Sequence, residues 1–228
     1  VSALSKLTQL TCMDNALGTL DLSKNTALTQ INCAADQLTE LKLPAGVQRL
    51  LCENNALTAL DLSGCTALTY LKCANNQLAT LNLSANTALS TLIVSNNHLP
   101  SLDLRANTAL AAVTLGRQTI TVNATLQDNV FYAPVGGLAA DGVVYQDTEK
   151  YENGNFVTAD YALMQNGFTY EYATGSDLAG AMTVDVTVVK DFYQVRFYGD
   201  ETKNVLLSAV AVNSGQTAVA PTDFALPQ

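Results

Sequence analysis

The first half of the chain repeats one short sequence unit six times. Each copy opens with two aliphatic residues three positions apart, followed two positions later by cysteine or an aliphatic residue. The first residues of the copies are Leu7, Leu28, Val47, Leu68, Leu89 and Leu110, at intervals of 21, 19, 21, 21 and 21 residues. A fixed period of this length predicts a solenoid, because one unit cannot bury its own leucines but stacked units share a continuous core.

The full unit reads L-x-x-L-x-C-x-x-N-x-L-x-x-L-x-L-S-x-N-T-A over residues 4–115. This motif resembles the leucine-rich-repeat family, and its cysteine-bearing form is similar to repeats of Bacteroidetes-type surface proteins. The resemblance implies a leucine-rich-repeat solenoid with a parallel β-sheet, a mostly extended or turn-like convex side and little helix. Alternation within the first block independently predicts a strand, with Leu10 and Cys12 pointing inward.

A polar residue follows each of the first five expected strands, is asparagine in all but one, and predicts a turn. The position holds Asn15, Asp36, Asn55, Asn76 and Asn97. Asparagine tolerates left-handed backbone and can hydrogen bond to the backbone of a turn. Asp36 lacks the amide donor, so we expect its coil to be less well tied.

Four cysteines occupy one position in successive units. They are Cys12, Cys33, Cys52 and Cys73. Parallel side chains on strands about 4.8 Å apart form neither a tetrahedral zinc site nor disulfides readily. We therefore expect a column of free, buried thiols that pack as small apolar groups. Cys65 lies outside this column, and the sequence allows its thiol to be exposed and reactive.

The second half has no repeat and reads as short strands separated by turns. Examples are Thr119–Asn123, Phe168–Tyr172 and Met182–Val188, with glycine-containing turns between them. We expect all-β modules after the solenoid (1–115): a small β-sandwich capping it (116–190) and a terminal segment (191–228). The solenoid followed by an all-β module resembles the internalin layout. The terminal segment resembles the start of a Listeria–Bacteroides repeat, a β-grasp-like module; a simple hairpin is the alternative.

Net charge excludes two classes of partner. Residues 1–115 carry six Lys/Arg and seven Asp/Glu, whereas residues 116–228 carry five and thirteen. Neither half has the basic stripe that nucleic acids or anionic membrane surfaces require. No apolar run approaches the roughly 20 residues of a membrane span, so we expect no membrane insertion in this part of the protein. The absence of an initial Met indicates that Val1 begins a trimmed or mature form.

Catalytic and cofactor motifs are absent from the sequence. The single histidine, His98, follows a turn residue and has no evident catalytic partner, so we interpret it as a solvated turn residue. Nucleotide-binding, hydrolase and metalloprotease signatures are missing. The acidic run from Asp147 to Asn155 offers oxygen ligands but lacks the register of a calcium loop. We expect no enzyme activity, no cofactor and no metal.

The outward positions of the strands offer a binding surface instead. Leu51 and Ile93 lie where the alternation predicts solvent, and the positions around them hold Arg49, Glu53, Tyr70 and Lys72. An apolar pair ringed by an aromatic residue and opposite charges is typical of an interface hot spot. The alternative is an ordinary decorated solvent face. We therefore predict a monomeric recognition or adhesion module that binds a protein or glycan at a bacterial cell surface or outside the cell; a structural spacer or accessory domain is the alternative.

Overall fold

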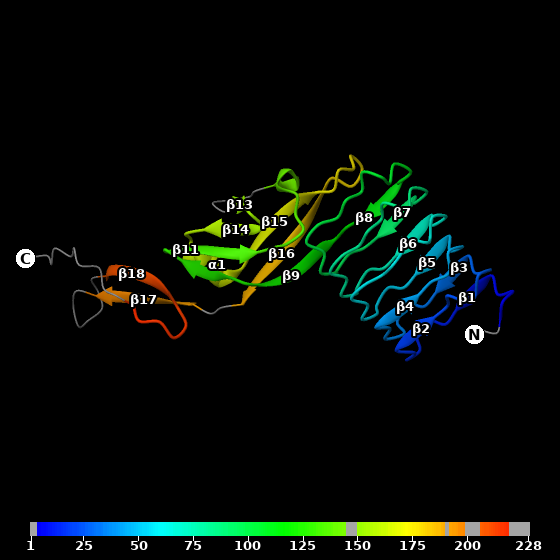
Figure 1. Cartoon of the computed structure of the whole chain (residues 1–228), viewed down its shortest axis with the longest axis horizontal. Coiled ribbons are helices and arrows are strands. Elements are labelled where there is room, and N and C mark those ends of the chain that lie inside the picture. Colours follow the sequence, from blue (N-terminus) through cyan, green and yellow to red (C-terminus); the bar gives the residue numbers. More distant parts are fainter. Residues whose placement is uncertain (1–3, 145–149, 190–191, 199–205, 219–228) are drawn as a thin grey trace, which may run out of the picture. The chain divides into compact units, whose positions relative to one another are not determined.

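Stacked coils build the first half of the molecule, in a computed structural model that describes residues 4–144, 150–189, 192–198 and 206–218. Six three-residue strands form one parallel sheet in the order β1-β3-β5-β6-β7-β8 (Figure 1). They are β1 (Gln9–Thr11), β3 (Gln30–Asn32), β5 (Arg49–Leu51), β6 (Tyr70–Lys72), β7 (Thr91–Ile93) and β8 (Ala112–Thr114). The leucine-rich-repeat solenoid with a parallel sheet is therefore confirmed.

The convex side is extended or turn-like, as predicted. Only the first two coils carry return strands, β2 (Thr19–Asp21) and β4 (Glu40–Lys42), which pair in parallel. No helix occurs in the described solenoid residues 4–115. The leucines of both blocks fill the interior, and Leu28, Leu50, Leu71 and Leu92 are fully buried.

Side-chain amides tie successive coils together inside the solenoid. Asn76 donates from Nδ2 to the carbonyl oxygens of Cys52 (3.0 Å) and Cys73 (3.1 Å), and its Oδ1 accepts from the Leu57 amide (3.0 Å). Asn97 repeats this pattern one coil later. Each such side chain satisfies buried backbone groups of two coils, which explains why the position requires both a donor and an acceptor.

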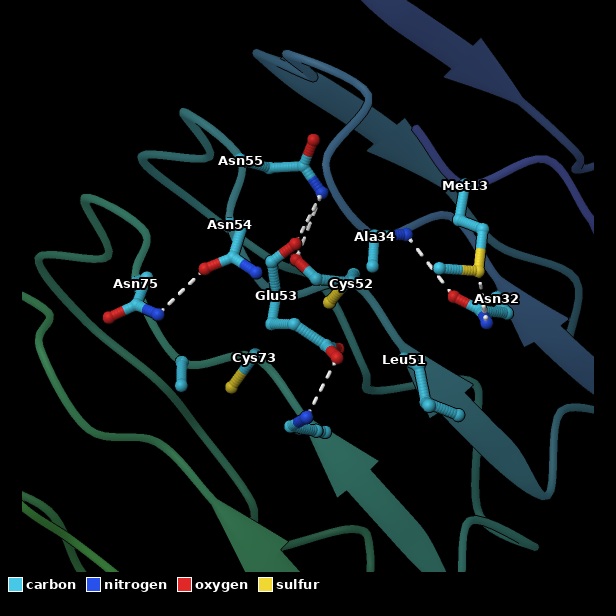
Figure 2. Close-up of polar contacts among 12 residues, drawn as sticks. Met13, Asn32, Ala34, Leu51, Cys52, Glu53, Asn54, Asn55, Cys73 and Asn75 are labelled. Carbon is cyan, nitrogen blue, oxygen red and sulfur yellow. Dashed lines mark hydrogen bonds and ion pairs between the residues drawn. The ribbon is translucent and has the colours of Figure 1, made fainter. Parts of the chain in front are cut away.

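The left-handed backbone lies one residue earlier than predicted. Positive φ angles occur at Asp14, Ala35, Asn54, Asn75 and Asn96, each directly before the turn residue named from the sequence. The turn asparagine instead points inward, while the left-handed residue stays at the surface. Three of these surface asparagines bond to one another. Asn75 donates to Asn54 at 2.7 Å (Figure 2), and Asn96 donates to Asn75 at the same distance. The left-handed conformation therefore lies one position earlier than expected, whereas the expected hydrogen bonds from the turn asparagine to the backbone are present.

A second set of buried asparagines ties the convex turns. Asn86 donates from Nδ2 to the carbonyl oxygens of Leu62 (3.1 Å) and Cys65 (2.8 Å), and Asn107 makes the equivalent bonds one coil later. Cys65 occupies this asparagine position and is only 2% exposed. Its thiol donates to the Pro44 carbonyl oxygen at 3.6 Å. The expectation that Cys65 could be exposed is therefore wrong.

The chain continues into β-structure that divides between two compact units. The first unit combines the solenoid residues up to Ile120 with 137–144 and 169–185, and the second contains the other described residues. One sheet runs β12-β15-β16-β9, formed by β12 (Val143–Val144), β15 (Phe168–Ala173), β16 (Ala181–Val189) and β9 (Arg117–Asn123). Tyr170 of β15 donates its hydroxyl to the Pro100 carbonyl oxygen (2.6 Å), so β15 contacts the last coil.

The second unit contains a four-stranded sheet and a hairpin. The sheet runs β10-β11-β14-β13, formed by β10 (Thr125–Gln127), β11 (Val130–Pro134), β14 (Asn155–Thr158) and β13 (Lys150–Glu152). The single α-helix of the described residues, α1 (Tyr161–Asn166), begins after Asp160, whose side chain accepts from two backbone amides of its first turn. A short 3-10 helix, η1 (Ala140–Gly142), lies in the first unit. The hairpin pairs β17 (Phe192–Tyr198) with β18 (Leu206–Asn213). The β-sandwich, the β-grasp-like repeat and the domain boundaries at 115 and 190 stay predictions.

Candidate recognition surface

The register of the parallel sheet brings the predicted binding residues together. Arg49 of β5 pairs with Tyr70 of β6, and Leu51 pairs with Lys72. Lys72 in turn pairs with Ile93 of β7. Residues that are 21 positions apart in the sequence are therefore direct neighbours on the outward face. We call Arg49, Leu51, Glu53, Tyr70, Lys72 and Ile93 the recognition patch.

Arg49 and Tyr70 form a stacked pair at one side of the recognition patch. The guanidinium carbon Cζ lies 3.6 Å from the centroid of the Tyr70 ring. This distance is within the range of a cation–π contact, which stabilises by about 0.5–1 kcal/mol at exposed sites. Both side chains are half-buried. The stacking fixes the plane of the guanidinium on a short strand of the solenoid.

An ion pair lies at the other side of the recognition patch. Lys72 Nζ is 2.8 Å from Glu53 Oε1, and Glu53 is only 9% exposed although it lies at an outward position (Figure 2). The hydrogen bond that Lys72 donates to Glu53 raises the pKa of Lys72. The second carboxyl oxygen, Oε2, is buried without a hydrogen-bond partner among the described residues. Lys72 therefore holds a desolvated carboxyl group, and removing the lysine would leave that group unpaired.

Two aliphatic side chains flank the ion pair. Leu51 and Ile93 lie on either side of Lys72 in the register of the sheet. Both are half-buried rather than fully exposed, because the neighbouring strands cover their flanks. The recognition patch thus combines apolar area with a fixed aromatic ring and fixed charges. How it binds stays a proposal, since the geometry by itself identifies no ligand.

The sheet is also hollowed beside the recognition patch, in a place that sequence reasoning did not select. A depression of about 290 Å³ lies over β1, β3 and β5. Its polar side chains come from the outward positions Gln9, Thr11, Gln30 and Asn32, and Arg49 and Leu51 close one side. We call this feature the Arg49 depression. The alternating outward positions could have pointed to it, because they place these four residues in the same two rows as Arg49 and Leu51.

Three of the four thiols in the cysteine column are fully buried, and Cys12 at its start is partly exposed. All described cysteines are free, and Cys33, Cys52 and Cys73 are completely buried. Burial, as the largest cause, raises the pKa of Cys33 and Cys73 to about 12. A thiol that keeps its proton is neither a nucleophile nor a metal ligand. The predicted role of these residues as small apolar groups is consistent with this geometry.

Other sequence candidates show no assembled chemistry. His98 is exposed and its Nδ1 lies 2.6 Å from the Thr119 carbonyl oxygen, so this nitrogen donates a hydrogen bond from its turn to strand β9. The described residues contain no cluster of three His, Cys, Asp or Glu side chains able to hold a metal ion. Asp147 and Glu149 of the acidic run lie outside the described residues. Within the part of the chain that the structure describes, no helix is both long and apolar enough to cross a bilayer.

Comparisons with known proteins identify the class of fold. No family model matches the chain, and no curated protein matches it. Among solved structures, the functional domain of InlJ from Listeria monocytogenes, which includes a cysteine ladder, aligns with a TM-score of 0.61 and 26% identity. The alignment covers 82% of this chain but 45% of the InlJ structure, so the chain spans less than half of that neighbour. The chain therefore has an internalin-like leucine-rich-repeat fold, which fits a surface recognition or adhesion module.

Proposed function

We propose that this chain is a non-catalytic recognition or adhesion module that binds a protein or glycan through its parallel sheet. The observation that carries the proposal is the recognition patch, whose members from three adjacent coils are in register. Leucine-rich-repeat solenoids present such rows on a rigid surface, and binding there requires little loop ordering. The patch is the part of the face where apolar, aromatic and charged groups coincide.

The composition of the patch favours binding over a purely decorative surface. Tyr70 and Arg49 belong to the residue types that dominate interface hot spots. Their stacking fixes both side chains before a partner arrives, so less conformational entropy is lost on association. Lys72 is likewise held by Glu53 at 2.8 Å. A solvated decorative face has no need for a desolvated carboxyl group held at an outward position.

The likeness to InlJ supports a location outside the cell. We propose that the chain acts at a bacterial cell surface or as part of a secreted protein, as a monomer and without catalysis. The chain spans less than half of the InlJ structure, so whatever partner the whole protein binds is itself part of the proposal.

A screen followed by matched variants tests the proposal. The chain is presented to arrays of matrix proteins and glycans, and each partner found is titrated against the double variant Tyr70→Ala/Arg49→Ala. We expect affinity to fall at least ~30-fold, as for a hot-spot loss of about 2 kcal/mol. Lys42→Ala, which removes an exposed, paired lysine from the return strand β4, should bind normally.

Thermal unfolding separates a binding defect from a folding defect. The double variant loses one cation–π contact between two half-buried side chains at the surface, so its midpoint should fall by less than about 4 °C. Undiminished binding by a folded double variant would refute the proposal and leave the structural spacer as the better explanation.

A further inference from the structure

We propose that the Arg49 depression is a subsite for an acidic sugar residue, whose carboxylate pairs with Arg49. The inference rests on the proposed function and deepens it by naming the class of ligand. It draws on four observations: an arginine without a carboxylate partner, its fixed orientation, a polar hollow beside it and the weak acidity of the solenoid.

Arg49 is the half-buried basic residue of the first unit that has no carboxylate partner among the described residues; Lys6 and Lys24 also lack one, but both are exposed. Lys42, Lys72, Arg105 and Arg117 each have a carboxylate partner within 3.1 Å. Arg49 has none within the described part of the chain, although it is half-buried against Tyr70. Stacking occupies a face of the guanidinium and leaves its N–H edge available. A planar fork of donors with a fixed orientation matches the two oxygens of a carboxylate.

The floor beside this fork suits sugar hydroxyl groups. Gln9, Gln30 and Asn32 present amides and Thr11 presents a hydroxyl, all from two outward rows. The Asn32 amide makes two hydrogen bonds within the chain: its Nδ2 donates to Met13 Sδ (3.4 Å) and its Oδ1 accepts from the Ala34 backbone amide (3.3 Å) (Figure 2). Amides donate and accept at once, as ligands rich in hydroxyl groups require.

A sugar fits the hollow better than a protein side chain does. Protein hot spots bury aromatic and aliphatic anchors in apolar pockets, whereas five of the eight residues that line this hollow are polar. Its aliphatic lining residues are Leu10, Ile31 and Leu51, of which only Leu51 is at an outward position. The volume of about 290 Å³ lies near the lower end of small-ligand sites. It therefore suits one or two sugar rings rather than an extended polymer.

The distribution of charge allows an anionic ligand to approach. The chain has a net charge of −9, but residues 1–115 contribute only −1 of it, from six basic and seven acidic residues. Outward positions of the sheet hold Arg49, Lys72 and Glu53 as their charged residues between Gln9 and Ser95. Since Glu53 is neutralised by Lys72, the local surface is positive at Arg49.

The test titrates the complete 228-residue chain with acidic sugars and their neutral counterparts. The probes are tri-galacturonate against galactotriose and 3′-sialyllactose against lactose, each up to about 10 mM, which detects affinities near 1 mM. Two-dimensional NMR follows the side-chain amides of Gln9, Gln30 and Asn32. We expect an acidic sugar to shift these signals and to bind at least ~10-fold more tightly than its neutral counterpart.

Three variants assign the interaction to the guanidinium. Arg49→Gln should weaken acidic-sugar binding at least ~10-fold, whereas Arg49→Lys, which keeps the charge but loses the fork, should fall between. Lys42→Gln removes the same charge from the return side and should bind as the natural chain does. Unchanged binding by Arg49→Gln, equal affinity for the neutral sugars, or no binding by either acidic sugar would overturn the inference.

A last arm separates this inference from the proposed function. An acetylated triglutamate peptide offers carboxylates without a sugar ring, and tighter binding of this peptide would overturn the sugar assignment. One outcome is that acidic sugars fail to bind while Tyr70→Ala/Arg49→Ala still lowers the affinity for a partner found in the screen. That result would refute the acidic-sugar subsite and support the recognition patch. If the acidic sugars bind through Arg49 while the double variant leaves the other partner unaffected, the larger patch falls instead.

Discussion

Replacing Asp36 by asparagine should stabilise the solenoid. The same position holds an amide in the neighbouring coils, where Asn55 donates to the Cys33 and Cys52 carbonyl oxygens at 2.9 and 3.0 Å. Asp36 is fully buried, and its carboxyl group accepts hydrogen bonds from the backbone amide of Asn15 (2.8 Å) and from the Cys12 thiol (3.3 Å). A carboxylate only accepts, so this coil lacks the donor that the others have.

The size of the effect follows from the bonds that change. Asparagine can keep the bond from the Asn15 amide on Oδ1 and place Nδ2 toward two carbonyl oxygens, as Asn76 does at 3.0 and 3.1 Å. Each neutral hydrogen bond contributes about 1 kcal/mol net. The weak thiol bond is lost, and the Cys33 carbonyl already accepts from Asn55, which reduces the gain. We therefore expect about 1–2 kcal/mol, or about 2–8 °C in the unfolding midpoint for a chain of this size.

Urea unfolding at pH 7 in reducing buffer measures the free energy, with the reciprocal change Asn76→Asp as the matched control. That control removes a complete set of donors and should destabilise by at least ~2 kcal/mol. The reasoning that this position requires a side-chain amide would be refuted if Asp36→Asn lowered the stability. It would also be refuted if Asp36→Asn left the stability unchanged while Asn76→Asp lowered it.

Cys12 gives an independent readout of the same change. Its pKa is raised to about 12, first by burial and then by the hydrogen bond and charge of Asp36. Asp36→Asn removes the two smaller causes, so the pKa should fall while remaining above that of a free thiol. Alkylation of Cys12 near pH 9 should therefore quicken in the stabilised variant, and an unchanged rate would show that Asp36 does not act on this thiol.

Two further predictions concern the interior. Burial raises the pKa of Cys52 well above its ordinary value, so the unfolded chain loses this proton at lower pH than the folded chain. The contribution of Cys52 to the free energy of unfolding should be complete below about pH 8.5 and fall by up to ~1.4 kcal/mol per pH unit above it. Cys52→Val introduces the residue that occupies the equivalent position as Val94, and it should make the free energy of unfolding decline less steeply above that pH. Parallel pH dependences of the variant and the natural chain would contradict this. Gly116→Ala should cost more than Gly180→Ala in urea unfolding, since both have positive φ but only the Cβ at 116 would meet Ser95, at 2.5 Å; equal losses would show that backbone strain alone decides.

The sequence was sufficient to predict which outward residues are neighbours. A parallel sheet with one coil per repeat places residues 21 positions apart side by side, so Arg49 and Tyr70 could be paired from spacing alone. The burial of Glu53 and the stacking of Arg49 could not be predicted in this way. Both depend on side-chain rotamers, which are set by contacts across coils rather than by the period.

The errors at the turns have a different physical origin. Asn54-Asn55 and Asn75-Asn76 are each a pair of adjacent asparagines, and either member of a pair could adopt the left-handed backbone. Hydrogen bonding decides between them, because the second asparagine must turn inward to reach the carbonyl oxygens of two coils. Composition is therefore ambiguous here, and the positive φ at Ala35 shows that the backbone imposes the conformation even where no asparagine is available.

Spacing remains informative where residue type fails. Gln118 follows Leu115 by the same three positions that separate Asn97 from Val94, and it occupies the same buried place in the ladder. Its Nε2 donates to the Val94 and Leu115 carbonyl oxygens (3.2 and 3.0 Å), and its Oε1 accepts from the backbone amide of Asn97 (3.2 Å). A glutamine can replace the asparagine because both carry the amide that the backbone requires. The ladder is therefore defined by a donor and an acceptor at a fixed distance along the chain, which is the requirement that Asp36 meets only in part.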